Sequence, residues 1–149
     1  MVGGGSNEVT LAYPGEPLGT NQSLEAIVFP TSFIGLLADI PGASCTQSTS
    51  DGLFGILVTD CTGAPITDSS NITVTVQQNS TMAGDAPIDV GALFKSVFSS
   101  SALEGFFLVC NVPPGTTTVN ASYMSKTFLQ RTVSSVANEA TETIVRPGY

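Results

Sequence analysis

A chain of 149 residues is long enough for one domain with a substantial core, and 42% of its residues are hydrophobic while only 11% are charged. Its formal net charge of -8 leaves only 4 Lys and Arg residues to neutralise phosphates, so we expect no nucleic-acid partner. Few charges together with many aliphatic residues also exclude a disordered chain.

The shortage of charge is made up mainly by Ser, Thr, Asn and Gln, and no uninterrupted run of about 18 apolar residues occurs. The most apolar stretch, residues 26–45, is broken by Pro30, Asp39 and Pro41. These interruptions favour short buried segments, and we expect no membrane span.

Residues 1–48 are interpreted as an extended N-terminal arm. The segment EVTLAY, residues 8–13, places Val9, Leu11 and Tyr13 at period two, which is typical of a strand. Several chain-breaking residues follow it: Pro14, Gly15, Pro17 and Gly19. We therefore expect this strand not to fold back as a hairpin on its own domain.

Residues 49–149 carry short β-rich runs about every ten residues, separated by Pro and Gly turns. Three runs alternate or are rich in β-branched residues, and they cover residues 71–78, 116–123 and 141–146. The turn signals between runs are CTGAP, AGDAP and VPPG. This pattern predicts an all-β, immunoglobulin-like or transthyretin-like antiparallel sandwich of about seven strands.

Helical signals are weak. Residues 23–29 and 91–100 could each form a turn or two, but Phe94, Val97 and Phe98 suit a strand equally well. We therefore interpret the domain as β throughout.

Residues 105–115, GFFLVCNVPPG, followed by a Thr/Val strand, resemble the Gly-x-Phe-x-Val-x-Asn-Val-Pro-Pro-Gly signature of carboxypeptidase regulatory-like domains. Residues 58–66, VTDCTGAPI, resemble the first strand and turn of the same family, and residues 69–76 resemble its second strand. The resemblance spans residues 52–149 and implies a transthyretin-like, or prealbumin-like, sandwich in which Val-Pro-Pro-Gly turns the chain over the rim.

The chain departs from that family in two places. Ile56 stands where Gly is frequent, with Gly55 one position away, and this predicts a bulge or a register change there. The segment between residues 78 and 105 is longer than a minimal domain needs, so we expect an inserted strand or a short helix.

The cysteines Cys45, Cys61 and Cys110 allow three single pairings, each leaving one thiol over. In the fold that the resemblance implies, the strand ending at Cys110 runs antiparallel to residues 52–60, and this brings Cys110 near Cys45 and far from Cys61. The resemblance therefore implies a Cys45–Cys110 disulfide, with Cys61 free or intermolecular. Three reduced cysteines in an intracellular protein are the alternative.

The chain has no His, which removes the Ser-His-Asp arrangement and the usual catalytic zinc sites. The carboxylates are scattered, so a catalytic pair such as Asp60 with Glu104 has no support from spacing, and Asp85 with Asp89 is a weak basis for calcium. We expect no enzymatic activity, no cofactor and no metal.

Asn-x-Ser/Thr triplets begin at Asn21, Asn71, Asn79 and Asn120, and each is a glycosylation candidate if the chain is exported. The low charge, the abundant Ser and Thr and the implied disulfide favour an extracellular or cell-surface location.

Two classes of function follow from these features. The first is a non-catalytic extracellular structural module that assembles with its own copies into an oligomer or filament, with Val9, Leu11 and Tyr13 adding a strand to a neighbour's sheet edge. The alternative is a binding or adhesion module that recognises a glycan or a protein, or an accessory domain of a larger secreted enzyme. Absence of Trp weakens the binding alternative, because aromatic residues commonly form such sites.

Overall fold

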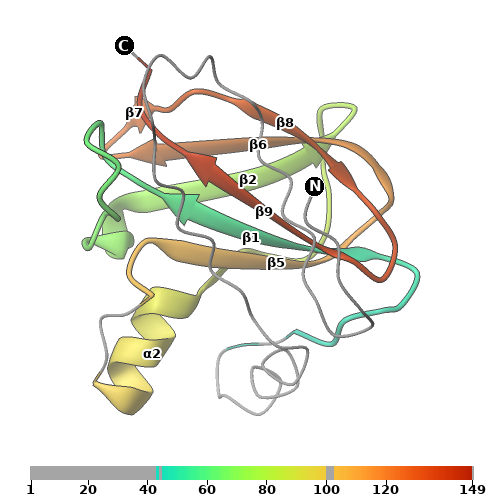
Figure 1. The fold of residues 1–149 in the computed structure, drawn as a ribbon, viewed down its shortest axis with the longest axis horizontal. Helices are drawn as coiled ribbons and strands as arrows, with labels where there is room; N and C mark the ends of the chain where they lie inside the picture. Colours follow the sequence, from blue (N-terminus) through green and yellow to red (C-terminus); the bar gives the residue numbers. More distant parts are fainter. Residues whose placement is uncertain (1–42, 44, 100–102, 149) are drawn as a thin grey trace, which may run out of the picture.

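Figure 1 shows the computed structural model of the chain, which describes residues 43, 45–99 and 103–148. Within these residues, two packed sheets form a sandwich with one α-helix, so the expected all-β sandwich is confirmed. The elements are β1 (Gly52–Val58), η1 (Ser69–Asn71), β2 (Ile72–Gln78), β3 (Thr81–Met82), β4 (Ile88–Asp89), α2 (Val90–Phe98), β5 (Phe106–Val112), β6 (Gly115–Tyr123), β7 (Lys126–Thr127), β8 (Arg131–Ser135) and β9 (Ala140–Val145). Strands β3, β4 and β7 have 2 residues each, too short to leave a sequence pattern.

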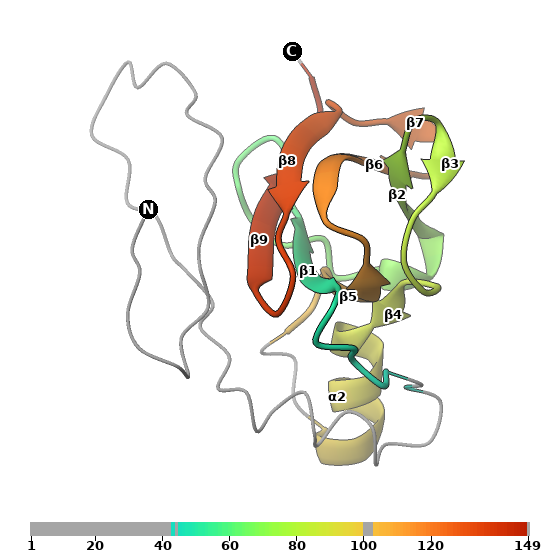
Figure 2. The same ribbon diagram turned by 90° about the vertical axis from the view of Figure 1, so that its right-hand side faces the viewer.

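The first sheet has the strand order β4-β5-β1-β9, and the second has the order β3-β2-β6-β7 with β8 also paired to β6. Figure 2 shows the two sheets as separate layers. The first sheet is not purely antiparallel, because β1 pairs antiparallel with β5 but parallel with β9.

Strands β1 and β5 are apolar on both faces because both faces of the first sheet are covered. Phe54 and Ile56 point into the core between the sheets. Leu53, Phe106 and Leu108 lie on the opposite face, in a second apolar cluster. Both strands therefore read as continuous apolar runs rather than as alternating ones.

Among the described residues, the second sheet is covered on one face only, and its strands alternate accordingly. In β2, Val74 and Val76 are buried while Thr73 is exposed. In β6, Val119 and Ala121 are buried between more accessible polar residues. The period-two pattern seen in the sequence is thus the signature of a sheet with one bare face.

Residues 90–98 form a helix, so the interpretation of the domain as β throughout is wrong at this segment. The inserted strand or short helix that we expect between residues 78 and 105 is here a short helix. Asp89 caps the helix by accepting a hydrogen bond from the Ala92 N–H at 2.8 Å. The helix ends at Ser99, which has a left-handed backbone with φ 53°.

The helix covers the outer face of the first sheet. Val90 is fully buried there, and Leu93 and Phe94 pack against the same cluster at the spacing of one helical face. The bare apolar side of β5 therefore decides in favour of a helix at a place where local pattern is ambiguous. In the described part of the chain, no helix has the length and apolar character needed to cross a membrane.

Val-Pro-Pro-Gly acts as the sequence predicts. It ends β5 of the first sheet and starts β6 of the second, so Pro113 and Pro114 carry the chain across the rim between the sheets. Gly115 has φ 141°, a conformation that favours glycine.

The expected irregularity of β1 lies elsewhere than predicted. Gly55 and Ile56 pair regularly with β5, whereas the register shifts between Gly52 and Phe54, close to Asn111 on β5. Asn111 has φ 57°, which Asn tolerates better than most residues. Gly55 is needed for space, because a Cβ there would lie 2.8 Å from Cζ of Phe106.

Candidate functional site

A disulfide joins Cys45 to Cys110, the pair that the resemblance implies. The two Cα atoms are 5.9 Å apart, and both side chains are buried against the outer face of the first sheet. The bond links the chain just before the sandwich to the middle of its core sheet. Cys61 is an exposed free thiol, so three reduced cysteines are not what the structure contains.

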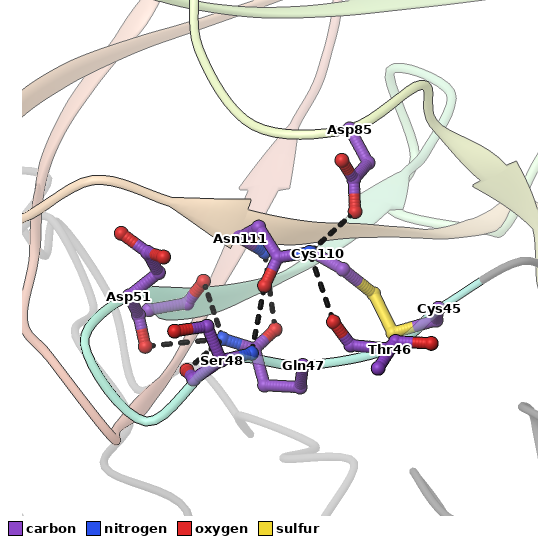
Figure 3. Close-up of a disulfide and its surroundings, with 9 residues drawn as sticks. Cys45, Thr46, Gln47, Ser48, Asp51, Asp85, Cys110 and Asn111 are labelled. Atoms are coloured by element: carbon purple, nitrogen blue, oxygen red, sulfur yellow. Dashed lines mark hydrogen bonds between the residues drawn. A yellow bond between two sulfur atoms is a disulfide. The ribbon is translucent and has the colours of Figure 1, made fainter.

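We call the contact between residues 45–48 and β5 the junction. Asn111 of β5 adds hydrogen bonds to it (Figure 3). Its side-chain amide donates to the carbonyl of Thr46 at 3.0 Å and to a carboxylate oxygen of Asp85 at 2.6 Å. Its side-chain oxygen accepts from the Ser48 N–H at 2.8 Å, and its own N–H donates to Oε1 of Gln47 at 3.1 Å. One residue of β5 thus holds three consecutive residues that follow Cys45, along with the segment before β4.

Gln47 bonds to the turn that follows the junction and leads into β1. Its amide nitrogen donates to the carbonyls of Ser48 and Asp51, both at 3.0 Å, and to that of Gly52 at 3.3 Å. These bonds close the turn that leads into β1. Residues 45–48, the described end of the expected arm, are therefore bonded to the sandwich.

Sequence reasoning missed Asn111 and Gln47. Asn111 occupies the Asn position of the Val-x-Asn-Val-Pro-Pro-Gly signature, and that was the only available signal. Its partners are remote in the sequence, 63 residues away for Ser48, so no local pattern could identify them.

A groove of about 530 Å³ lies at the rim that holds Cys61. Its polar lining includes Asp60, Asp68, Tyr123 and Lys126. The two carboxylates shape turns here: Oδ1 of Asp60 accepts from the Thr62 hydroxyl at 2.6 Å, and Asp68 accepts from the Ser70 hydroxyl at 2.6 Å.

These hydrogen bonds lower the pKa of both groups. For Asp60 the main cause is the Thr62 hydroxyl, and for Asp68 it is the Ser70 hydroxyl followed by the Asn71 amide. A carboxylate with a lowered pKa is a poor proton donor near neutral pH, so neither group suits general acid catalysis.

The other carboxylates singled out in the sequence also have structural partners. Glu104 pairs with Lys95 at 3.1 Å, Asp85 bonds to Asn111, and Asp89 caps α2. Among residues 43, 45–99 and 103–148, no cluster of three or more His, Cys, Asp or Glu could hold a metal.

The second sheet carries the described glycosylation candidates. Asn71 precedes β2 and Asn79 follows it, and both are exposed. Asn120 lies on β6, half-buried, with its amide 3.4 Å from Oε1 of Gln77. Asn21 and the arm residues Val9, Leu11 and Tyr13 lie outside the described residues.

The outer face of this sheet consists of short uncharged polar side chains. They alternate with the buried residues of β2, β6 and β8 and pair across strands, as Thr75 does with Asn120 and Thr118 does with Thr132. The face comprises Thr73, Thr75, Gln77, Thr116, Thr118, Asn120, Ser122, Thr132 and Ser134.

In comparisons with known proteins, no family model matches this chain and no curated protein matches it. The fold and the disulfide together define a class: a β-sandwich domain in which a disulfide joins the segment just before β1 to β5 of the first sheet.

Proposed function

We propose that this protein is a non-catalytic structural module of the cell exterior, whose copies assemble into an oligomer or filament through the N-terminal arm. The observation that supports it is the junction built by Cys45, Cys110 and Asn111. A covalent bond and several hydrogen bonds connect the base of the arm to β5, which itself pairs with β1 and β4. A force on the arm would therefore act on β5 and, through its neighbours β1 and β4, on the first sheet.

The arm supplies the binding segment. Val9, Leu11 and Tyr13 stand at the period of a strand, which is what strand addition to a neighbouring sheet requires. Burying three such side chains contributes roughly 5 to 8 kcal/mol, from which several kcal/mol of ordering entropy must be subtracted. A single contact of that size is reversible, but contacts repeated head to tail propagate into an open polymer.

An exported location and a family relationship belong to the same proposal. A buried disulfide persists in oxidising compartments, and the candidate sequons on the second sheet would be accessible to modifying enzymes there. We propose that residues 52–149 form a distant carboxypeptidase regulatory-like domain. Support comes from the two-proline turn between β5 and β6.

Deleting residues 1–20 tests the proposal. The truncated protein is expected to keep its β-type circular dichroism and thermal midpoint while remaining monomeric in light scattering, whereas the full chain assembles as its concentration rises. Normal assembly by the truncated protein, or a full chain that stays monomeric at every concentration, would show that the arm does not assemble the protein.

A matched pair of full-length variants tests whether assembly needs the apolar side chains of the arm or only the presence of an arm. Replacing Val9, Leu11 and Tyr13 by Ser should abolish assembly. Replacing Glu8, Thr10 and Ala12 by Ser should leave it largely intact, because those side chains lie on the opposite face of a strand.

The groove beside Cys61 favours a second candidate, a binding module for a glycan or protein. Its volume of about 530 Å³ is within the usual range for ligand sites, and Tyr123 with Lys126 offers an aromatic ring beside a cation. A glycan array probed with full-length protein tests this. Binding lost in Tyr123→Ala but kept after deletion of residues 1–20 would support this candidate.

A further inference from the structure

We infer that the outer edge of β2 is the acceptor for the donated strand, and that its occupant is residues 8–13 of a second copy of this chain. The inference rests on the proposed function and names the surface that function needs. Strand addition requires backbone N–H and C=O groups without partners along a sheet edge. The sandwich has two sides where the sheets end, one between β8 and β9 and one between β2 and β4.

The side between β8 and β9 is already bridged. The Thr141 hydroxyl donates to the carbonyl of Ser134 at 3.2 Å, and Nε of Arg131 donates to the carbonyl of Ile144 at 3.2 Å. These bonds use carbonyl groups that an added strand would need.

The first sheet is also protected on its other side. Strand β4 has only 2 residues before the chain turns into α2. Beyond it, the N–H of Asp85 bonds to the carbonyl of Cys110 at 2.8 Å. The edge of β5 is therefore occupied by its own chain at Asp85 and at Ile88–Asp89.

Strand β2 differs from these edges. Its ladder with β6 uses Thr73, Thr75 and Gln77, because the Met124 N–H bonds to the carbonyl of Asn71 and antiparallel bonding pairs recur at every second residue. The backbone groups of the residues between them consequently face away from β6. Strand β3 covers only the last part of that outer side.

Some of the outward-facing backbone groups of β2 have partners within the described chain. The Ile72 N–H bonds back to the carbonyl of Ser69, and the carbonyl of Val76 accepts from the Ala83 N–H at 2.9 Å. This leaves the carbonyl of Ile72, both backbone groups of Val74 and the N–H of Val76 without a partner in the described part of the chain.

The edge also lacks the usual protection against added strands. Natural edges are commonly guarded by charged residues, Pro or a bulge, and ITVTVQQ of β2 has no charge and no Pro and pairs with β6 in unbroken register. Figure 2 shows β2 and β3 at the end of the second sheet away from β8. An incoming strand would extend the sheet there.

The pattern of residues 8–13 suits this place. Apolar side chains at period two would continue the inner row of Ile72, Val74 and Val76, and the intervening residues would continue the row of threonines outside. Near the start of β2, an opening of about 350 Å³ lies between η1 and α2.

The length of the arm allows a second copy to be the source, which is the occupant that the proposed assembly requires. Residues 14–44 separate the donated segment from Cys45, and at about 3.3 Å per residue they span on the order of 100 Å when extended. That is several times the radius of gyration of a domain of this size, roughly 13 Å. A tether of that length can reach the β2 edge of a neighbouring copy as well as that of its own chain, and the crosslinking experiment below distinguishes the two.

Val74→Pro in the full chain tests the edge. The Val74 N–H faces outward, so Pro there leaves the ladder with β6 intact while removing a donor and obstructing an added strand. We expect the concentration needed for assembly to rise at least about tenfold. Ile144→Pro is the matched control, because it removes an outward N–H on β9, and assembly should be unchanged.

Cysteine crosslinking covers the case in which Val74→Pro does not fold. In a Cys61→Ser background, a mixture of the Thr10→Cys and Thr73→Cys proteins should give a disulfide-linked pair made of one chain of each. Thr132→Cys, on the outer face of β8, is the control and should give none with Thr10→Cys.

The outcomes separate this inference from the proposed function. Normal assembly of folded Val74→Pro, or crosslinking to Thr132→Cys in place of Thr73→Cys, overturns the β2 acceptor, although assembly that still needs residues 1–20 leaves the proposed function standing. A crosslink formed only within one chain in the Thr10→Cys, Thr73→Cys double variant overturns the second copy as occupant.

Discussion

The two sheets of the sandwich differ in how much of their surface is covered. In the first sheet, β1 and β5 are apolar on both faces. This sheet packs between the second sheet and α2, and the Cys45–Cys110 disulfide joins it to the segment that precedes β1. The second sheet buries one face and exposes a face of uncharged hydroxyl and amide side chains. It also contains the outer edge of β2, which in the described part of the chain is covered only at its end by β3.

The proposed function gives the two sheets different roles. Burial on both faces makes the first sheet the stable element to which an arm can be anchored, because apolar burial is the main source of folding free energy. A bare face and a free edge add little stability, but they leave surface for other chains and for modification. The following predictions test that division, from the largest effect to the smallest.

Truncating a buried aromatic of the first sheet should have the largest effect. Phe106 is fully buried on the outer face of β5, and Phe106→Ala is expected to lower the free energy of unfolding by about 3–5 kcal/mol. Thr118→Ala, on the outer face of the second sheet, should change it by less than about 0.5 kcal/mol. Urea unfolding at low protein concentration measures both, and equal losses would mean that the second face is buried as well.

Removing the disulfide should come next. Replacing both Cys45 and Cys110 by Ala opens a link between residues 65 apart and is expected to lower the free energy of unfolding by about 2–4 kcal/mol. Cys61→Ser is the control, since its thiol is exposed and unpaired, and stability should stay within about 0.5 kcal/mol. A double variant as stable as the control would show that the disulfide does not stabilise the domain.

Asn111 tests the hydrogen-bonded part of the junction. Asn111→Ala leaves the Ser48 N–H without its acceptor and puts Ala at φ 57°, so we expect a loss of about 2–3 kcal/mol. Asn138 has the same φ of 57° but is exposed, and Asn138→Ala should show only the backbone part, about 1 kcal/mol. Equal losses would assign the whole effect to backbone strain.

The rim with Cys61 should respond to acid. Because hydrogen bonds hold the folded-state pKa of Asp60 and Asp68 below the ordinary 3.8, they add stability that is present above about pH 4. That stability is lost as the pH falls through the lowered pKa values. Thermal midpoints between pH 6 and pH 2 should therefore fall less in Asp60→Ala than in the parent, and Thr62→Val, which removes the strongest donor to Asp60, should behave likewise.

The sequence allowed the disulfide of the candidate site to be predicted, but not its hydrogen bonds. The pairing of Cys45 with Cys110 follows from strand direction once a fold is assumed, and the structure contains that pair. The role of Asn111 could not be inferred, because its partners come from segments that meet only after folding. Asp60 differs, because its carboxylate shapes a turn by accepting from Thr62 and Ala64, which are close to it in the sequence.

By itself, the sequence determined the elements whose cause is local. Period-two alternation predicted β2 and β6, since it reflects a sheet with one covered face, and two prolines before Gly115 predicted a forced crossing between the sheets. Tertiary structure alone decided the helix at residues 90–98, the parallel pairing of β1 with β9 and the free edge of β2. Each of these depends on which distant segment covers a face or an edge, and no local spacing of residues encodes that choice.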